Sequence, residues 1–359
     1  MKKLISILLL MTTLVCLFAS CNTADTDGAG DGTDTTVLGE DTATTTTDDS
    51  ADTALREKYE EANRLLDSCE YEAAYQMLKE LGDYEDSIDM LERFVYVPLK
   101  NIQTYGETTY TYEYKYNENN LPSQVVISMG EQQMSMDYTY NEAFLLTKIV
   151  YTQPNGTTGV EDFTYDENGN LIKDDRTDYD GSKYIREYTY DENNNLIKEV
   201  RTYHDNSKST IDYTYDASGN LIKEEQTDSD GITNVIDYTY DASGSLTKEE
   251  QTDSNGNTSV IDYTYDASGN LTKKEEADSD GNTSVIDYTY DASGNLIKEE
   301  QTYPYGHYVE EYTIDANGNK TKIVYTQPDG STAITEIEYK LVYISCEIRG
   351  ILKDMLFSE

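Results

Sequence analysis

A repeat of 25 residues is the feature that most constrains how this chain folds. A Tyr-Asp pair recurs at that spacing six times in succession, and drifted copies stand on either side. A fixed period of this length indicates a repeat architecture, in which each unit buries its apolar face only by stacking on its neighbours. The pairs are Tyr165/Asp166, Tyr190/Asp191, Tyr215/Asp216, Tyr240/Asp241, Tyr265/Asp266 and Tyr290/Asp291, with drifted copies at Tyr116/Asn117, Tyr140/Asn141 and Ile314/Asp315.

One unit, residues 259–278 with the sequence SVIDYTYDASGNLTKKEEAD, shows the pattern inside each repeat. Its first part alternates strictly, with Ile261, Tyr263 and Tyr265 on one face, and this period of two is typical of a half-buried strand. The residues DASGN that follow favour a turn, because Gly accepts positive φ and Asp bonds its own backbone. A more polar strand and a second turn, DSDGN, complete the unit.

Each unit is therefore predicted to be one β-hairpin, and the hairpins are expected to span residues 105–346. The predicted fold class is mainly β: an elongated or coiled antiparallel β-hairpin repeat array of about nine 25-residue units, or about 16 to 19 strands. Twist forbids a flat sheet of that width, so we expect the sheet to coil or to fold over as two layers. Its apolar face is predicted to carry Tyr, Ile and Leu, and the opposite face Asp, Thr, Glu and Gln.

The charge and the scarcity of histidine exclude several classes of function. The 359 residues contain 27 Lys and Arg against 70 Asp and Glu, a net charge of -43, whereas a nucleic-acid partner requires a basic surface. The two histidines, His204 and His307, stand in loops of different units, and no nucleophile, base and orienting group come together. We therefore predict no catalytic residues and a protein that is not an enzyme.

The N-terminus has the pattern of a targeting segment over residues 1–20. Lys2 and Lys3 precede a mainly apolar run, and small residues stand directly before Cys21. The segment resembles a bacterial lipoprotein signal peptide, which implies cleavage before Cys21 and lipidation of its thiol. An ordinary secretory signal or a short membrane helix is the alternative, but the run is shorter than the roughly 20 residues that a span needs. We predict export, with Cys21 anchoring the chain at the bacterial cell membrane or cell surface.

Three further segments flank the repeats. Residues 21–53, rich in Thr and Asp, lack apolar periodicity and are predicted to be a disordered tether. Residues 54–97 have helical spacing and are predicted to form a small N-terminal α-helical cap, with Val95 in a third helix. Residues 347–359 are predicted to be a C-terminal cap over the last strand edge. Cys69, the one remaining thiol before the repeats, is expected to be buried and unpaired.

The helical segment resembles a tetratricopeptide unit. The residues that carry this resemblance are Ala62, Leu65, Tyr71, Ala74 and Leu78. It covers little more than one repeat, whereas a stack needs about three, so a cap is favoured over a peptide-binding groove.

The repeats resemble the tyrosine-aspartate family, also called RHS-type repeats. The family pattern stands here as YTYDASGNL and, in its second half, as YDENGNL, and the match covers about two-thirds of the chain. In large members such repeats wind into a hollow β-shell around a toxin or bind at cell surfaces. The resemblance therefore implies coiling β-hairpins and surface display.

Tyrosines on alternate strands are the candidate ligand-binding residues. They would form two rows, with neighbouring tyrosines about 10 Å apart from the strand spacing. Exposed rows would stack on the sugar rings of a glycan or on a partner protein, and buried rows would be the core of the sheet. The candidates are Tyr188, Tyr190, Tyr213, Tyr215, Tyr238, Tyr240, Tyr263, Tyr265, Tyr288 and Tyr290.

The turns that read DxDG are weak candidates for calcium. Asp228 and Asp230 stand in one such turn, and Asp278 and Asp280 in another. Counted from Asp278, however, the glycine comes too early for an EF-hand, and position twelve is Thr289 rather than a carboxylate. Tight hairpin turns favour the same residues, so turn chemistry and weak calcium binding both remain open.

These observations predict an exported, lipid-anchored surface protein with a non-catalytic scaffold or recognition role. Its repetitive β-sheet surface would recognise an extracellular protein or a glycan, and its membrane contact would pass through lipidated Cys21. A purely structural spacer and a calcium-dependent binding module are the alternatives. No cofactor other than calcium is implied.

Overall fold

The computed structural model describes residues 49–91 and 93–344 and divides into two compact units. One unit contains the described residues up to Val97 and from Lys340 onward, and the other runs from Pro98 to Tyr339. The predicted signal peptide with Cys21, most of the predicted tether and the predicted C-terminal cap lie outside the described residues. None of the helices in the described part of the chain combines the length and the apolar character that crossing a membrane requires.

Helices make up most of the first unit. They are α2 (Asp49–Asp67), α3 (Tyr71–Leu81) and α4 (Ser87–Leu91). Their core contains Ala62, Leu78, Leu81 and Met90, all nearly inaccessible to solvent. The predicted spacing of the first two helices is therefore correct, and α2 begins at Asp49, so it includes the last five residues of the stretch predicted to be tether.

Two details of this unit differ from the predictions. Val95 lies in a strand, because α4 ends at Leu91 and a β-branched, alternating segment follows from Phe94. Cys69 is unpaired but exposed, because it ends α2 in a left-handed conformation with φ 60° at the surface.

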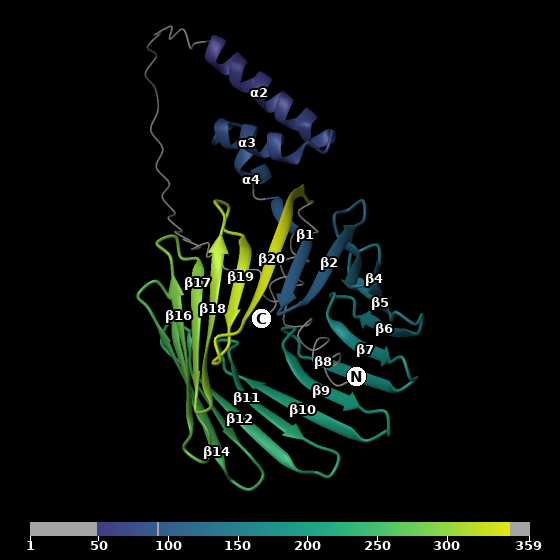
Figure 1. Ribbon diagram of the computed structural model, residues 1–359, viewed down its shortest axis with the longest axis vertical. Helices are drawn as coiled ribbons and strands as arrows, with labels where there is room; N and C mark the ends of the chain where they lie inside the picture. The colour runs from purple at the N-terminus through teal and green to yellow at the C-terminus, as the bar shows by residue number, and fades with distance from the viewer. Residues whose placement is uncertain (1–48, 92, 345–359) are drawn as a thin grey trace, which may run out of the picture. The chain divides into compact units, whose positions relative to one another are not determined.

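Twenty strands form one sheet, in which successive strands pair in chain order (Figure 1). The strands are β1 (Phe94–Tyr105), β2 (Thr108–Tyr116), β3 (Pro122–Met129), β4 (Gln132–Tyr140), β5 (Leu146–Thr152), β6 (Thr158–Tyr165), β7 (Leu171–Thr177), β8 (Lys183–Tyr190), β9 (Leu196–Thr202), β10 (Lys208–Tyr215), β11 (Leu221–Thr227), β12 (Thr233–Tyr240), β13 (Leu246–Thr252), β14 (Thr258–Tyr265), β15 (Leu271–Ala277), β16 (Thr283–Tyr290), β17 (Leu296–Tyr303), β18 (Gly306–Ile314), β19 (Lys320–Thr326) and β20 (Thr332–Tyr343).

The sheet closes on itself, because β1 pairs with β20. The predicted mainly β array of antiparallel hairpins is confirmed, whereas the elongated form is wrong: the sheet is a closed barrel of twenty strands. Twist accumulated over so many strands brings the two ends of the sheet together, and pairing them leaves no free edge. The strand count exceeds the predicted range because residues from Phe94 onward also form a strand.

Each Tyr-Asp pair ends a strand and begins a turn. In the unit of β14 and β15, Asp266 Oδ1 accepts hydrogen bonds from the backbone N–H groups of Ser268 and Asn270, at 2.8 and 2.9 Å. Asp266 Oδ2 accepts a third from Asn270 Nδ2 at 2.9 Å, and these bonds lower the pKa of the carboxyl. Gly269 N–H closes the turn on the Asp266 carbonyl with φ +86°, a conformation that favours glycine. The aspartate therefore shapes the hairpin.

The tyrosine of each pair ties its hairpin to the preceding one. Tyr265 donates a hydrogen bond from its hydroxyl to the Leu246 carbonyl at 2.8 Å, nineteen residues earlier in the chain. The same bond recurs around the ring, and Ile314 interrupts the series because it has no hydroxyl. The other pairs are Tyr116 to Pro98, Tyr140 to Pro122, Tyr165 to Leu146, Tyr190 to Leu171, Tyr215 to Leu196, Tyr240 to Leu221, Tyr290 to Leu271 and Tyr339 to Lys320.

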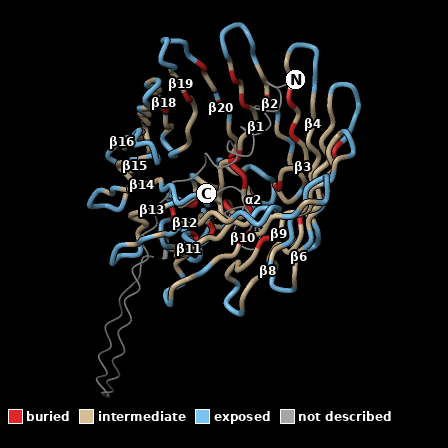
Figure 2. The backbone as a smooth tube through the Cα atoms, turned by 90° about the horizontal axis from the view of Figure 1, so that it is seen from below, coloured by how far each residue is buried: buried red, intermediate tan, exposed pale blue. Residues whose placement is uncertain are grey.

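Buried side chains of the second unit gather on the tyrosine face of the sheet. Side chains crowd on the concave side of a closed sheet, and we call this side the inner face. In Figure 2 the hairpin turns are exposed, and the strands between them are mostly half-buried. The buried strand residues on the inner face are Asn101, Gln103, Tyr112, Val125, Ile127, Gly159, Glu161, Asp174, Glu199, Ile211, Tyr312, Ile323, Ala333 and Ile337.

We expect the substitution Tyr265→Phe to lower the free energy of unfolding by about 1 kcal/mol, because it removes one inter-hairpin hydrogen bond and keeps the ring. Tyr305→Phe is the matched control, since Tyr305 is 74% exposed and its hydroxyl makes no hydrogen bond to the described residues. Equilibrium unfolding in urea measures both. Equal stability of the two variants would contradict a structural role for the hydroxyl.

Candidate functional site

All ten candidate tyrosines are half-buried on the inner face, so they are neither fully exposed nor fully buried. Those that precede the Asp of each unit form the first row, whose hydroxyls bind the carbonyls described above. The second row lies two residues earlier in each strand and consists of Tyr188, Tyr213, Tyr238, Tyr263 and Tyr288. The tyrosine hydroxyls therefore already have hydrogen-bond partners in the sheet, so a ligand at either row would contact the edges and faces of the rings.

Three tyrosines of the second row, Tyr213, Tyr238 and Tyr263, donate hydrogen bonds to glutamates of neighbouring strands. Tyr238 donates to Glu224 at 2.7 Å, and Tyr263 donates to Glu249 at 2.6 Å. Burial and these carboxylates raise the pKa of both tyrosines, so the hydroxyls remain protonated donors. The sequence reasoning placed Glu and Gln on the opposite face, which is wrong for these residues.

A register shift explains that error. Tyr265 pairs with Leu271 and Thr264 with Lys273, so β15 contains one extra residue, Thr272, at a β-bulge. Beyond the bulge, Lys274 pairs with Tyr263 on the inner face, and the matching positions of other units hold glutamate. Only the position of the bulge fixes which of two successive polar residues faces inward.

Two carboxyl groups lie buried together where the repeats depart from their consensus. Glu161 is 7% exposed and Asp174 is 4% exposed, on the neighbouring strands β6 and β7. Tyr151 donates to Glu161 Oε2 at 2.6 Å, and Arg186 Nε lies 3.2 Å from Asp174 Oδ2. Asp174 Oδ1 meets no donor among the described residues. The sequence contained a signal: Glu161 stands where the regular units have isoleucine, as at Ile211.

Burial and, next, the negative charge of Glu161 raise the pKa of Asp174 to about 7, although Arg186 lowers it in part. Asp174 is therefore protonated at acidic pH and becomes charged as pH rises through neutrality, because a second buried negative charge beside Glu161 is unfavourable.

The calcium candidates serve as turn residues in the structure. Asp228 Oδ1 accepts the backbone N–H groups of Asp230 and Ile232, each at 2.9 Å. Asp278 Oδ1 accepts those of Asp280 and Asn282 in the same way. Within the described residues, no three His, Cys, Asp or Glu side chains gather as a metal site would require. Calcium binding at these turns stays a prediction, as does lipidation of Cys21, which lies outside the described residues.

The repeat architecture and its turns match a known family. The model of the teneurin YD-shell matches residues 86–283, more than half of the chain, and the model of the RHS repeat matches residues 265–308. This chain belongs to the teneurin YD-shell family. The resemblance to tyrosine-aspartate repeats read from YTYDASGNL is therefore confirmed.

No curated protein matches this YD-shell chain, whereas solved structures do. A crystal structure of TcdB2-TccC3-TEV is 16% identical over 63% of this chain, with a TM-score of 0.31, and the match covers 15% of that chain. The Tc holotoxin pore of Photorhabdus luminescens is 16% identical over 69% of this chain and 16% of its own, with a TM-score of 0.31. A porin-like protein from Bacteroides uniformis is 13% identical over 68% of this chain and 98% of its own, with a TM-score of 0.33.

The buried acid pair predicts a pH dependence of stability. The pKa of Asp174 is raised on folding, so its bound proton stabilises the fold below its ordinary pKa, and that contribution is lost as pH rises through about 7. We expect Asp174→Asn to be more stable than the wild type at pH 8, by roughly 2 to 4 kcal/mol. At pH 4 the two should differ little. Urea unfolding at intervals from pH 4 to pH 8 measures this.

Asp162→Asn is the control, because Asp162 lies on the outer face of β6 with its side chain 56% exposed. Its effect on the free energy of unfolding should be small at every pH. Parallel pH profiles of the wild type and Asp174→Asn would show that folding does not raise the pKa of Asp174.

Proposed function

We propose that this YD-shell protein is an exported scaffold, held at the bacterial membrane through lipidated Cys21, with a recognition role rather than a catalytic one. The observation that supports the proposal best is the closure of the sheet by β1 and β20. A repeat array without free edges offers no unpaired strand to which another chain could add, so it resists edge-to-edge aggregation. That property suits a protein displayed outside the cell.

The bonding inside the sheet supports a rigid scaffold. Hydroxyl to carbonyl bonds join successive hairpins, and hydroxyl to carboxylate bonds hold three tyrosines of the second row, as between Tyr263 and Glu249. These tyrosine hydroxyls and glutamate carboxylates, which can act as acids or bases in enzymes, are thus occupied by hydrogen bonds within the sheet. This commitment favours a holding or presenting role over chemistry.

The outer face supports solubility. Lysine and carboxylate side chains two residues apart form ion pairs on alternate strands, with Nζ to oxygen distances of 2.6 to 3.1 Å. Exposed pairs of this kind contribute little to stability individually, and the surplus of acid keeps copies of the chain apart. The pairs are Lys173/Asp175, Lys223/Glu225, Lys248/Glu250, Lys273/Glu275 and Lys298/Glu300.

Recognition would use the tyrosine rows, which repeat one half-exposed ring at regular intervals. Weak contacts of this kind gain affinity when an extended partner engages several of them together. A glycan or an extended protein segment has the required repetition. If the tyrosine rows bind no such partner, the alternative is a purely structural spacer.

We expect Cys21→Ser to release the protein from the membrane fraction of a bacterium that expresses it, and to abolish incorporation of a labelled fatty acid. Cys69→Ser is the matched control, since it changes a different thiol and should leave both readouts unaltered. Fractionation and labelling of the full chain measure this. Retention of Cys21→Ser in the membrane fraction would refute the anchor.

We expect Tyr263→Ala to weaken binding to a responsive glycan or cell-wall fraction by about two- to tenfold, while Tyr263→Phe, which keeps the ring, binds nearly as well as the wild type. A binding screen followed by titration of both variants measures this, with circular dichroism to verify folding. Absence of binding by the wild type to every fraction would favour the spacer.

A further inference from the structure

The arginines of the second unit lie side by side. Between Pro98 and Tyr339 the sequence has only Arg176, Arg186 and Arg201, and they fall on the consecutive strands β7, β8 and β9. Arg186 pairs across the sheet with Arg201 on one side and with Asp174 on the other. In a chain of net charge -43, the guanidinium groups of the barrel are thus concentrated in one place.

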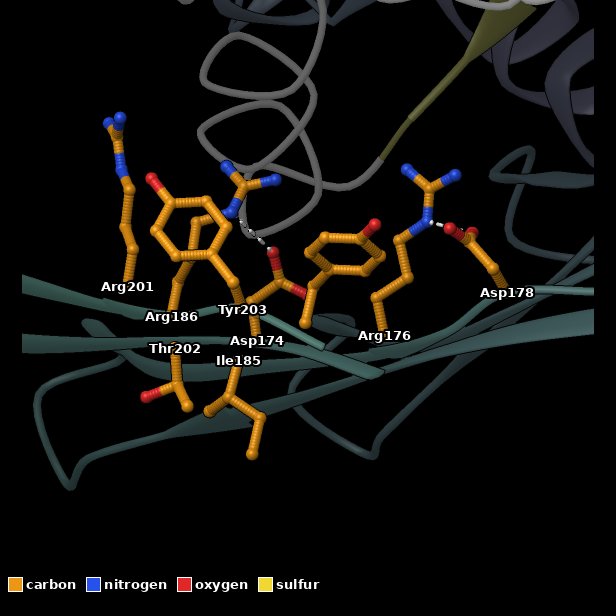
Figure 3. A pocket seen from close by; sticks show the side chains of 9 residues that line it. Asp174, Arg176, Asp178, Ile185, Arg186, Arg201, Thr202 and Tyr203 are labelled. Atoms are coloured by element: carbon orange, nitrogen blue, oxygen red, sulfur yellow. Dashed lines mark hydrogen bonds and ion pairs between the residues drawn. The ribbon is translucent and has the colours of Figure 1, made fainter. Parts of the chain in front are cut away.

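A cavity of about 220 Å³ lies among these arginines. Figure 3 shows the three guanidinium groups on the same side of the strands, while Ile185 and Thr202 point to the opposite side. Tyr184 and Tyr203 also line the cavity, and Tyr203 is 37% exposed. The cavity therefore offers guanidinium groups together with aromatic surface.

Each guanidinium is held by a carboxylate, and Arg186 is also hydrogen-bonded to the Tyr188 hydroxyl. Arg176 Nε lies 2.7 Å from Asp178 Oδ1, and Arg186 Nε lies 3.2 Å from Asp174 Oδ2. Arg201 donates from Nε and Nη2 to the buried Glu199, at 2.6 and 3.3 Å. The structure gives the terminal nitrogens of Arg176 no acceptor among the described residues, and Nη1 of Arg201 has none either. Arginines fixed in this way present donors with little entropy left to lose.

The acid partners do not cancel the attraction for an anion. The carboxylates contact the Nε side of each guanidinium, which leaves the terminal nitrogens of Arg176 and Nη1 of Arg201 available to a ligand. The raised pKa of Asp174, about 7, reduces its negative charge beneath the cavity at neutral pH. The three guanidinium side chains are 33%, 48% and 41% exposed, so a ligand can reach them.

We propose that this cavity binds the oxyanion group of a small organic acid, a carboxylate or a phosphate, whose carbon skeleton packs on Tyr184 and Tyr203. Planar guanidinium groups match both oxyanions through paired N–H donors. The cavity of about 220 Å³ is smaller than the roughly 300 Å³ or more of pockets for drug-sized ligands, so it suits a single small molecule rather than a polymer chain. The site is independent of the anchor proposed above, and it adjoins the second tyrosine row at Tyr188, which is hydrogen-bonded to Arg186.

Calorimetric titration of the purified full chain with glucuronate, glucose 6-phosphate and glucose tests this, at constant ionic strength because exposed charges are screened by salt. The first two probes distinguish a carboxylate from a phosphate, and glucose tests binding by aromatic surface alone. We expect at least one of the two anions to bind and glucose not to bind. Binding of neither anion at millimolar concentration, or equal binding of glucose, would overturn the proposal.

Arg176→Gln and Arg201→Gln should each lower the affinity for the bound anion by about ten- to a hundredfold. Lys198→Gln is the matched control: it removes one positive charge and one ion pair, with Asp212 at 2.8 Å, from the opposite face of the same strand as Arg201. Its affinity should equal that of the wild type. Equal losses in all three variants would show charge screening only and would refute the site.

Arg201→Lys covers the case in which a glutamine variant does not fold. It keeps the charge beside Glu199 but loses the second N–H of the fork, so a folded variant with reduced affinity is expected. Unchanged affinity in folded Arg201→Lys and Arg176→Gln would place the anion elsewhere.

Discussion

One recurring type of hydrogen bond, from a tyrosine hydroxyl to a carbonyl of the preceding hairpin, links the hairpins of the barrel to one another. A hairpin alone is marginally stable, and its neighbours supply what it lacks. The Tyr265 hydroxyl reaches the Leu246 carbonyl while its own strand continues into the turn that Asp266 shapes. The two residues of the Tyr-Asp pair thus have different tasks: the tyrosine joins units, and the aspartate reverses the chain.

Hairpins could be predicted from the sequence because their determinants are local. Alternation in TSVIDYTY and the turn residues DASGN lie within a few positions of one another, and the structure has the strands and turns there. Closure could not be predicted in the same way. It depends on twist summed over twenty strands and on a pairing between residues more than two hundred positions apart, for which no single unit contains a signal.

The faces of the second strand of each unit were harder to predict, and the reason is the bulge. A one-residue shift in register moves every later side chain to the other face. The extra residue at Thr272 does this, so that Lys274 rather than Lys273 faces Tyr263. The prediction that the tyrosine face is purely apolar failed for that reason, and the glutamates that bond the second row were missed with it.

Departures from the repeat indicate where one unit differs chemically from the next. In the regular units the tyrosines bond glutamates of the preceding hairpin, as Tyr263 bonds Glu249, and each unit offers the same surface as its neighbours. In β6 to β9 glutamate and arginine replace isoleucine at Glu161 and Arg186, and arginine replaces glutamine at Arg176 and Arg201. Buried charge is costly unless it is paired, and these replacements lie in adjacent strands where each charge finds a partner. The irregular units in β6 to β9, rather than the consensus units, therefore give this shell a chemically distinct surface that a purely structural shell would not need.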